Sequence, residues 1–233
     1  MEAPPLTRDT ARTLIAEPPA PLPLPPGPYE LHVTGLRTRW PDGEAVALDD
    51  ADLVLPAGRR VALVARGRVG TSALAAVLLR FLDYEGTITL NGVELRDLSG
   101  DDVRSVIGLC ARDTRMLPAT VAGNVRVARP DATDEQVAGA MRRAGLDLPP
   151  DQAMGEPDGD VRQRVALARA LLADVPIIIV DDPDDGRAGD SALTELLAAA
   201  EDRTLLLVTH RVIVPGAAPI LRHVDEVITL SDL

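Results

Sequence analysis

Hydrophobic and polar positions divide the chain into short apolar runs that alternate with amphipathic segments. Apolar runs of strand length predict β-strands, at 29–36, 45–55, 60–64, 86–90, 93–95, 106–110, 176–180, 204–208 and 226–230. Apolar residues at helical spacing predict α-helices, at 7–17, 72–82, 134–144, 161–173 and 191–200. From residue 60 onward, this alternation predicts a mostly parallel sheet covered by helices on both faces.

Local signals place several turns and one helix end. Asn91-Gly92 separates two predicted strands and is a strong hairpin signal, while residues 41–43 predict a turn between the first two strands. The simplest arrangement of the first two strands, at 29–36 and 45–55, is an antiparallel β-layer. Thr133 is a candidate N-cap for the helix at 134–144, and residues 146–160 have the composition of a loop.

A proline-rich stretch predicts the division of the chain. Seven of the residues in 18–28 are proline, which fixes φ and removes backbone donors, so this stretch is expected to be stiff and extended. We therefore expect residues 1–28 to form a helix plus linker, and residues 29–233 to form one domain.

Composition narrows the possible functions. The chain has 233 residues, a formal net charge of −12 and a pI near 4.7, which fits one soluble globular domain and disfavours non-specific nucleic-acid binding. Its apolar runs fall far short of the roughly 20 residues that span a bilayer, and its start lacks the features of a secretory signal. We expect a cytosolic site of action. The single cysteine, Cys110, is expected in the core, and the chain contains no lysine.

Polar residues follow three of the predicted buried strands. A glycine-containing loop follows Val64, the pair Asp181-Asp182 follows an apolar strand, and Thr209-His210 follows another. The carboxyl ends of parallel strands are where such sheets bind ligands. A strand that ends in an acidic pair is typical of a metal-coordinating carboxylate followed by a general base. For each of the three strand ends taken alone, a polar end exposed to solvent is the simpler explanation.

Residues 65–72 have the frame of a phosphate-binding loop, G-x-x-x-x-G-K-[ST]. In that motif, backbone N–H groups and a helix N-terminus bind phosphates, a lysine spans two of them and a hydroxyl ligates Mg²⁺. Gly70 and Ser72 match the frame, whereas Ala65 replaces the first glycine and Thr71 replaces the lysine.

From residue 29 onward the chain resembles the nucleotide-binding domain of an ABC transporter of the exporter type. The matching segments occur in the family's order: Trp40, the loop at 65–72, the stretches 93–99, 106–109, 113–114 and 119–124, the helix at 162–171, the Walker B strand at 175–183 and the segment 205–211. The resemblance implies an α/β P-loop NTPase fold of the ABC type, with a mostly parallel sheet, helices on both faces, an N-terminal antiparallel β-layer and a small helical subdomain at about 113–173. It also implies that residues 1–28 correspond to the connector after a membrane-spanning half.

The resemblance also implies roles for particular residues. Trp40 would stack on adenine, Ser72 and Asp181 would hold Mg²⁺, and Asp182 and His210 would be catalytic. The residues that would bind the phosphates are Arg66, Gly67, Arg68, Gly70, Thr71 and Ser72. Arg112 stands at the position of the glutamine loop, and Asp158 and Gly159 stand in the signature motif, which in the family contacts the nucleotide of the opposing subunit.

Several of these positions depart from the family pattern. No lysine can replace the one missing at Thr71, although Arg66 and Arg68 carry positive charge. Asp182 is one methylene shorter than the family's glutamate, so we expect it to fall short of the attacking water. In the signature, Asp158 and Asp160 would repel a polyphosphate, and Asp160 is the preferred candidate to cap the helix that follows.

These residues support three readings of function. The first is an ATP-binding subunit of an ABC transporter that binds ATP and Mg²⁺ weakly and hydrolyses ATP slowly or not at all. Its partners would be a membrane-spanning subunit and a second nucleotide-binding domain, at the inner face of the cell membrane. The second is a non-catalytic ABC-fold module for interaction or regulation. The third is an intact ATPase in which arginines compensate for the missing lysine.

Overall fold

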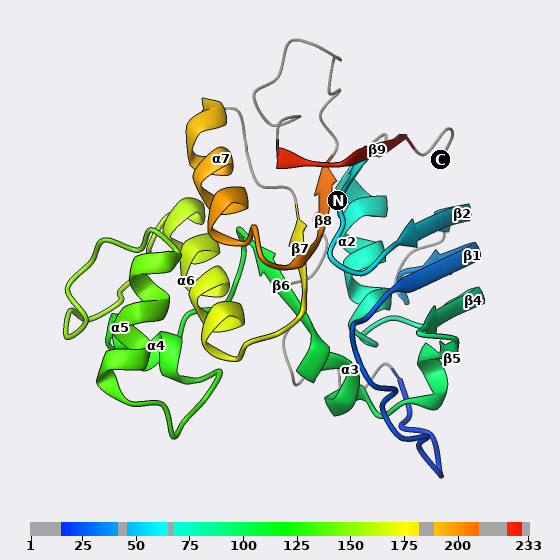
Figure 1. Cartoon of the computed structure of the whole chain (residues 1–233), viewed down its shortest axis with the longest axis horizontal. Coiled ribbons are helices and arrows are strands. Elements are labelled where there is room, and N and C mark those ends of the chain that lie inside the picture. The colour runs from blue at the N-terminus through cyan, green and yellow to red at the C-terminus, as the bar shows by residue number, and fades with distance from the viewer. Residues whose placement is uncertain (1–14, 42–45, 65–67, 182–188, 210–222, 230–233) are drawn as a thin grey trace.

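Two sheets with different directions of strand pairing form the framework of the molecule (Figure 1). The computed structural model describes residues 15–41, 46–64, 68–181, 189–209 and 223–229, without the side chains of residues 68, 69 and 189–192. The first sheet is antiparallel, in the order β2 (Val46–Leu55), β1 (Leu31–Arg39), β4 (Glu85–Leu90) and β5 (Val93–Glu94). Its strands β1 and β2 form the predicted antiparallel β-layer, and the hairpin of β4 and β5 extends that layer beyond the prediction.

The second sheet is parallel, and its central strands are buried on both faces. Its order is β6 (Ile107–Ala111), β7 (Ile177–Asp181), β8 (Thr204–Thr209), β3 (Arg60–Val64) and β9 (Glu226–Thr229). Alternate residues of β7 and β8 enter two different hydrophobic cores, because successive side chains of a strand point to opposite faces. Ile179 and Leu206 belong to the core shared with the antiparallel sheet, whereas Ile178 and Leu205 belong to the core shared with the later helices.

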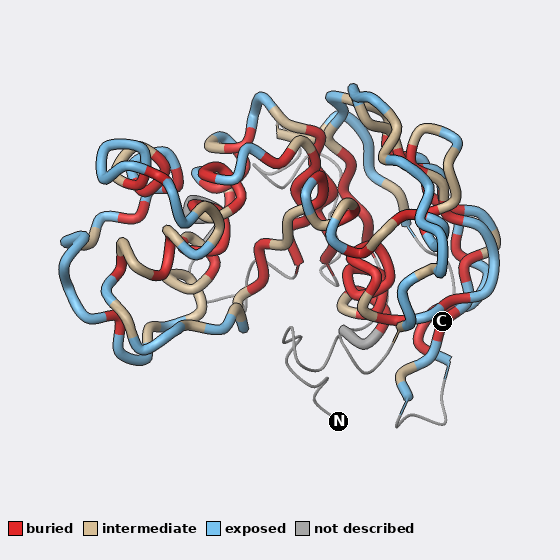
Figure 2. Tube along the Cα trace, turned by 90° about the horizontal axis from the view of Figure 1, so that it is seen from below, coloured by how far each residue is buried: buried red, intermediate tan, exposed pale blue. Residues whose placement is uncertain are grey.

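Helices cover both faces of the parallel sheet, as the sequence predicts. Helix α2 (Arg68–Leu78) contacts strands of both sheets and lies between them (Figure 1). On the other side, α4 (Val121–Arg126), α5 (Asp134–Arg143), α6 (Gly159–Leu172) and α7 (Gly189–Ala199) lie together. Figure 2 shows buried residues along the central strands and helices, and exposed residues around the outside. Cys110 lies in the helical-side core, where burial raises the pKa of its thiol to about 12.

Several local predictions are confirmed. Asn91 and Gly92 have φ of 47° and 80°, the left-handed values that a tight hairpin turn between β4 and β5 requires. Thr133 caps α5 by accepting a hydrogen bond from the Gln136 backbone N–H, and the Gln136 side chain completes a capping box. The helix expected at 7–17 lies mostly outside the described residues, and residues 15–17 are not helical.

The limits predicted for the helix after β3 are wrong at both ends. The prediction was 72–82, whereas α2 runs over Arg68–Leu78. It begins earlier because residue 68 is arginine, which prefers right-handed helical backbone, where a phosphate loop usually has glycine. It ends earlier because Arg80 adopts φ of 57° and Phe81 N–H donates to Ala76 O over 2.7 Å, which closes the last turn.

Three further elements of the fold were not predicted. They are the 3₁₀ turn η1 (Leu95–Asp97), α3 (Gly100–Val106) and α4. Each is too short to show a clear helical period in the sequence. Within the described residues, no helix is both long enough and apolar enough to cross a membrane.

Candidate functional site

The carboxyl ends of three parallel strands meet at one edge of the five-stranded sheet. Val64 of β3 lies opposite Thr209 of β8, and Asp181 of β7 lies opposite Val208 of the same strand. The structure therefore brings together the start of the predicted phosphate loop, the predicted Walker B aspartate and the residue before His210. Open α/β sheets bind their ligands at this edge.

Ser72 and Asp181, the two predicted Mg²⁺ ligands, form a polar pair at this edge of the sheet. The Ser72 hydroxyl donates a hydrogen bond to Asp181 Oδ2 over 3.2 Å, and Asp181 is only 8% exposed. A hydroxyl and a carboxylate are oxygen ligands of the kind that Mg²⁺ prefers, and an octahedral ion at about 2.0–2.1 Å keeps neighbouring oxygens about 3 Å apart. The pair therefore fits the magnesium ion that the resemblance implies.

This pair supplies only part of a coordination shell. No group of three or more His, Cys, Asp or Glu side chains suited to a metal occurs among the residues that the structure describes. Mg²⁺ typically takes one or two protein ligands and completes its shell with water and phosphate oxygens, so a hydroxyl and one carboxylate suffice. The site is thus suited to a metal that arrives with a phosphate ligand.

The described part of the phosphate loop is helical. Gly70, Thr71 and Ser72 all belong to α2; Gly70 is buried, and Thr71 is only 1% exposed and has a polar contact. Arg66 and Gly67 lie outside the described residues, as does the side chain of Arg68. Their predicted contacts with phosphate remain predictions.

Trp40 follows β1 and lies at the edge of the core shared by the two sheets. Its ring is partly buried and packs against that core, and its indole N–H is buried with no hydrogen-bond partner among the described groups. The part of the ring that remains accessible is compatible with stacking on a base. Stacking on adenine remains a prediction.

Arg112 and Asp160 form an ion pair, so of the two partners open to Arg112 from the sequence, a phosphate or an acidic neighbour, the structure shows an acidic neighbour. Arg112 follows β6, Asp160 lies in the first turn of α6, and their side chains are 21% and 37% exposed. Gly159 permits this approach, because a Cβ there would lie 2.8 Å from Nε and Nη2 of Arg112. The glutamine-loop position and the signature position therefore contact each other within one chain.

The predicted capping role of Asp160 is wrong, because Asp158 performs it. Asp158 Oδ1 accepts a hydrogen bond from Val161 N–H over 2.9 Å, and Asp158 has the extended backbone of an N-cap. Asp160 is two residues further on, inside the helix, where its carboxylate faces Arg112 instead. Both signature carboxylates therefore have partners within the chain.

The cap gives a stability prediction. Replacing Asp158 with alanine leaves Val161 N–H without its side-chain acceptor, so the free energy of unfolding should fall by about 1 kcal/mol. Urea denaturation followed by circular dichroism measures this change. Asp158→Ser is the matched control, because serine caps as well as aspartate does; an equal loss in both variants would contradict the capping role.

Three more side chains of α6 connect it to β6 and the loop that follows. Gln163 Nε2 donates to Cys110 O over 3.2 Å, Arg162 Nη1 donates to Thr114 O over 3.4 Å, and Arg169 Nη1 donates to Arg115 O over 3.2 Å. Burial lowers the pKa of Arg169. The only sequence signal for these contacts was the occurrence of polar residues on an otherwise apolar helix face.

A groove of about 820 Å³ lies beside these contacts. Its lining consists of Arg115, Met116, Leu117, Pro118, Ala119, Thr120, Ala153, Met154, Gly155, Glu156 and Arg162. Leu117 remains 40% exposed, so the groove offers an accessible apolar side chain. The two predicted catalytic residues, Asp182 and His210, lie outside the described residues.

Comparison with known proteins places this arrangement in a family. The model of the family described as "ABC transporter" matches residues 48–185. The chain is 35% identical over 199 residues to the glutathione/L-cysteine transport system ATP-binding/permease protein CydD of Escherichia coli K12, covering 79% of this chain and 34% of that protein. It is 33% identical over 222 residues to the ATP-dependent lipid A-core flippase of Salmonella typhimurium, covering 87% and 37%.

A solved structure shows the same fold. The structure of a bacterial Atm1-family ABC exporter with ATP bound superposes with a TM-score of 0.77 at 23% identity, covering 93% of this chain and 39% of that one. The chain thus spans little more than a third of the length of these relatives. Since the family model matches more than half of the chain, the chain belongs to the ABC transporter family.

Proposed function

We propose that this chain is the ATP-binding domain of an exporter-type ABC transporter that binds Mg-ATP weakly and hydrolyses it slowly or not at all. The observation that carries the proposal is the Ser72–Asp181 pair at the carboxyl ends of β3 and β7. A bound Mg²⁺ would neutralise charge on the phosphates. The residues of the chain would then have to orient the nucleotide and exclude water.

Weak binding follows from what α2 can offer to a phosphate. The helix N-terminus carries a positive dipole end, and Ser72 supplies a metal ligand. No lysine exists to add a point charge. A hydrogen bond to a charged group contributes about 1.5–3 kcal/mol, so its loss weakens binding roughly tenfold to a hundredfold.

Slow hydrolysis is proposed from two further positions. Asp182 is shorter than the glutamate of the family and would hold its carboxylate too far from the attacking water. Asp158 and Asp160 replace residues that in the family contact the nucleotide of the opposing subunit. Their use as helix cap and as partner of Arg112 supports the view that this end of α6 serves the fold of its own chain.

We further propose that the groove lined by residues 115–120 and 153–156 receives a cytoplasmic helix of a membrane-spanning part. Two relatives are named ATP-binding/permease proteins, and the chain spans about a third or less of each. An open groove with exposed Leu117 suits the apolar face of such a helix. The chain would then act at the inner face of the cell membrane, paired with a second nucleotide-binding domain.

A second candidate function is a non-catalytic ABC-fold module for interaction or regulation. The Arg112–Asp160 pair favours it, because it occupies two positions that the family uses for nucleotide. Under this alternative the strand-end site would bind no nucleotide. The two candidates therefore differ in whether the chain binds Mg-ATP.

Calorimetry with Mg-ATP on the intact chain separates them. Under the first proposal, we expect a dissociation constant for Mg-ATP above about 10 µM. A tenfold to hundredfold loss from an affinity of about 1 µM gives a value in this range. Binding should also change the fluorescence of Trp40, the only tryptophan. Affinity of about 1 µM or tighter would contradict weak binding, and the absence of both heat and fluorescence change would favour the second candidate.

A variant tests the metal site separately. If Ser72 is a Mg²⁺ ligand, Ser72→Ala should abolish the difference in ATP affinity between buffer with Mg²⁺ and buffer with EDTA. Ser105→Ala is the matched control, because Ser105 is exposed and bonds only locally to Asp102 O. An unchanged metal effect in Ser72→Ala would remove Ser72 from the site.

A further inference from the structure

Residues 15–28, here called the strap, lie against the domain along its outer side. Leu22 N–H donates a hydrogen bond to Asp97 O over 2.8 Å. Toward the end of the strap, Asn91 Nδ2 donates to Pro26 O over 2.8 Å and to Pro28 O over 2.9 Å. Hydrogen bonds at several points fix an extended segment that the sequence alone describes only as a stiff linker.

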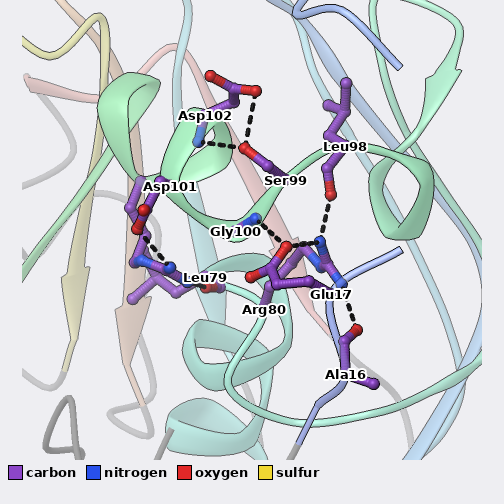
Figure 3. Close-up of polar contacts among 10 residues, drawn as sticks. Ala16, Glu17, Leu79, Arg80, Leu98, Ser99, Gly100, Asp101 and Asp102 are labelled. Atoms are coloured by element: carbon purple, nitrogen blue, oxygen red, sulfur yellow. Dashed lines mark hydrogen bonds and ion pairs between the residues drawn. The ribbon is translucent and has the colours of Figure 1, made fainter. Parts of the chain in front are cut away.

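The start of the strap is held by a buried arginine (Figure 3). The Arg80 side chain is 3% exposed, and its guanidinium donates to Leu98 O, to Ala16 O over 3.2 Å and to Glu17 Oε2 over 3.4 Å. The same Glu17 oxygen accepts a hydrogen bond from Gly100 N–H over 2.9 Å. A charge this deeply buried requires partners, and the strap supplies two of those that the structure describes.

Two backbone features are shaped around this contact. Arg80 adopts φ of 57°, a left-handed conformation that non-glycine residues rarely take. Gly100 has no Cβ, and one placed there would lie 2.7 Å from Glu17 Oε1. The guanidinium of Arg80 bonds to Ala16 O and Glu17, so the strap is an integral part of this arrangement.

Arg80 also joins the strap to the helix that begins at the nucleotide site. It lies two residues beyond the end of α2, inside the turn that Phe81 N–H closes onto Ala76 O. Helix α2 spans about 16 Å and carries Ser72 in its first turns, and its residues 73–78 are buried. A packed helix moves as a rigid body, so a displacement of one end also displaces the other end.

We propose that the strap is a fixed attachment for the segment that precedes the domain, and that its docking is coupled through α2 to the binding of Mg-ATP. The second half of this proposal rests on the proposed function. Coupling is reciprocal, so undocking the strap must change nucleotide affinity by the factor by which nucleotide changes docking. The connection is separate from the groove at 115–120, because it uses Arg80, η1 and α3.

The attachment is tested by hydrogen exchange at the Leu22 amide in the 233-residue chain. We expect at least tenfold protection in the wild type and its loss in Glu17→Lys, where a positive charge faces Arg80. Glu17→Lys is preferred to Arg80→Ala, because Arg80→Ala removes a buried side chain and is expected to unfold the protein. Glu30→Lys is the matched control, because Glu30 contacts exposed His32 instead. An unprotected Leu22 amide in the wild type, or equal protection in wild type and Glu17→Lys, would overturn the attachment.

The coupling is tested with Mg-ATP itself. We expect Glu17→Lys to change the Mg-ATP dissociation constant about fivefold relative to wild type and Glu30→Lys, and Mg-ATP to change Leu22 exchange by a similar factor. Equal affinities in all three proteins would overturn the coupling while leaving the proposed function intact. Absence of Mg-ATP binding in all three would overturn both the coupling and the proposed function, and the protection of Leu22 without nucleotide would still decide the attachment.

Discussion

Thr71→Lys is expected to strengthen Mg-ATP binding roughly tenfold to a hundredfold without appreciable turnover. The ammonium would add the charge-assisted contact to phosphate that this lysine-free chain lacks. Turnover needs more, because Asp182 would remain too short and the signature positions would remain acidic. Calorimetry and phosphate release at saturating Mg-ATP measure the two effects separately.

The burial of Thr71 calls for a control that separates charge from bulk. Thr71 is only 1% exposed, so the lysine stem must run along the start of α2 before its ammonium reaches the phosphates. Thr71→Met adds an unbranched side chain without the charge. We expect both variants to lose some stability to overpacking, but only Thr71→Lys to gain affinity for Mg-ATP.

Hydrolysis should require the combined variant Thr71→Lys, Asp182→Glu, Asp158→Ser and Asp160→Gly. A positioned general base contributes about 10²–10⁴-fold, so phosphate release should rise at least a hundredfold over the wild type. Serine at 158 keeps the helix cap, so the first turn of α6 should stay formed. Robust turnover by the wild type, or by Thr71→Lys alone, would show that the interpretation of the base and signature positions is wrong.

Regular elements and their ends were predictable where a residue type has one strong local preference. The parallel strands could be predicted because β7 and β8 contain the unbroken apolar runs 177–180 and 205–208, which are typical of strands buried on both faces. The hairpin turn at Asn91 and the cap at Thr133 could be predicted because their side chains or φ angles act locally. These features depend on neighbours within a few residues.

The parts that could not be predicted depend on partners distant in the sequence. Asp160 was expected to cap α6 because it directly precedes Val161, but its actual partner, Arg112, is 48 residues away. Arg80 adopts a left-handed conformation and bonds to Glu17, which is 63 residues away. No local sequence pattern predicts this conformation or this bond. The start of α2 was missed because the motif frame was assumed to remain loop at Arg68.

Removing the Arg112–Asp160 ion pair is expected to lower the free energy of unfolding by about 2 kcal/mol in either single variant. Arg112→Gln and Asp160→Asn each leave a partly buried charge without its opposite, since the side chains are 21% and 37% exposed. Arg112 has further contacts, so the loss of stability in Arg112→Gln includes more than the loss of the ion pair with Asp160. The double variant should recover about 1 kcal/mol of the summed loss, and urea denaturation of all four proteins gives this coupling.

Gly159 provides an independent route to the same contact. A Cβ at residue 159 would lie 2.8 Å from Nε and Nη2 of Arg112, so Gly159→Ala must displace the guanidinium from Asp160. The substitution should therefore destabilise the wild type. In the Arg112→Gln background that loss should disappear, and the substitution should stabilise α6 slightly, because alanine is a better helix former than glycine. The same sign of effect in both backgrounds, or additive losses in the Arg112 and Asp160 cycle, would mean that the pair does not hold α6 against β6.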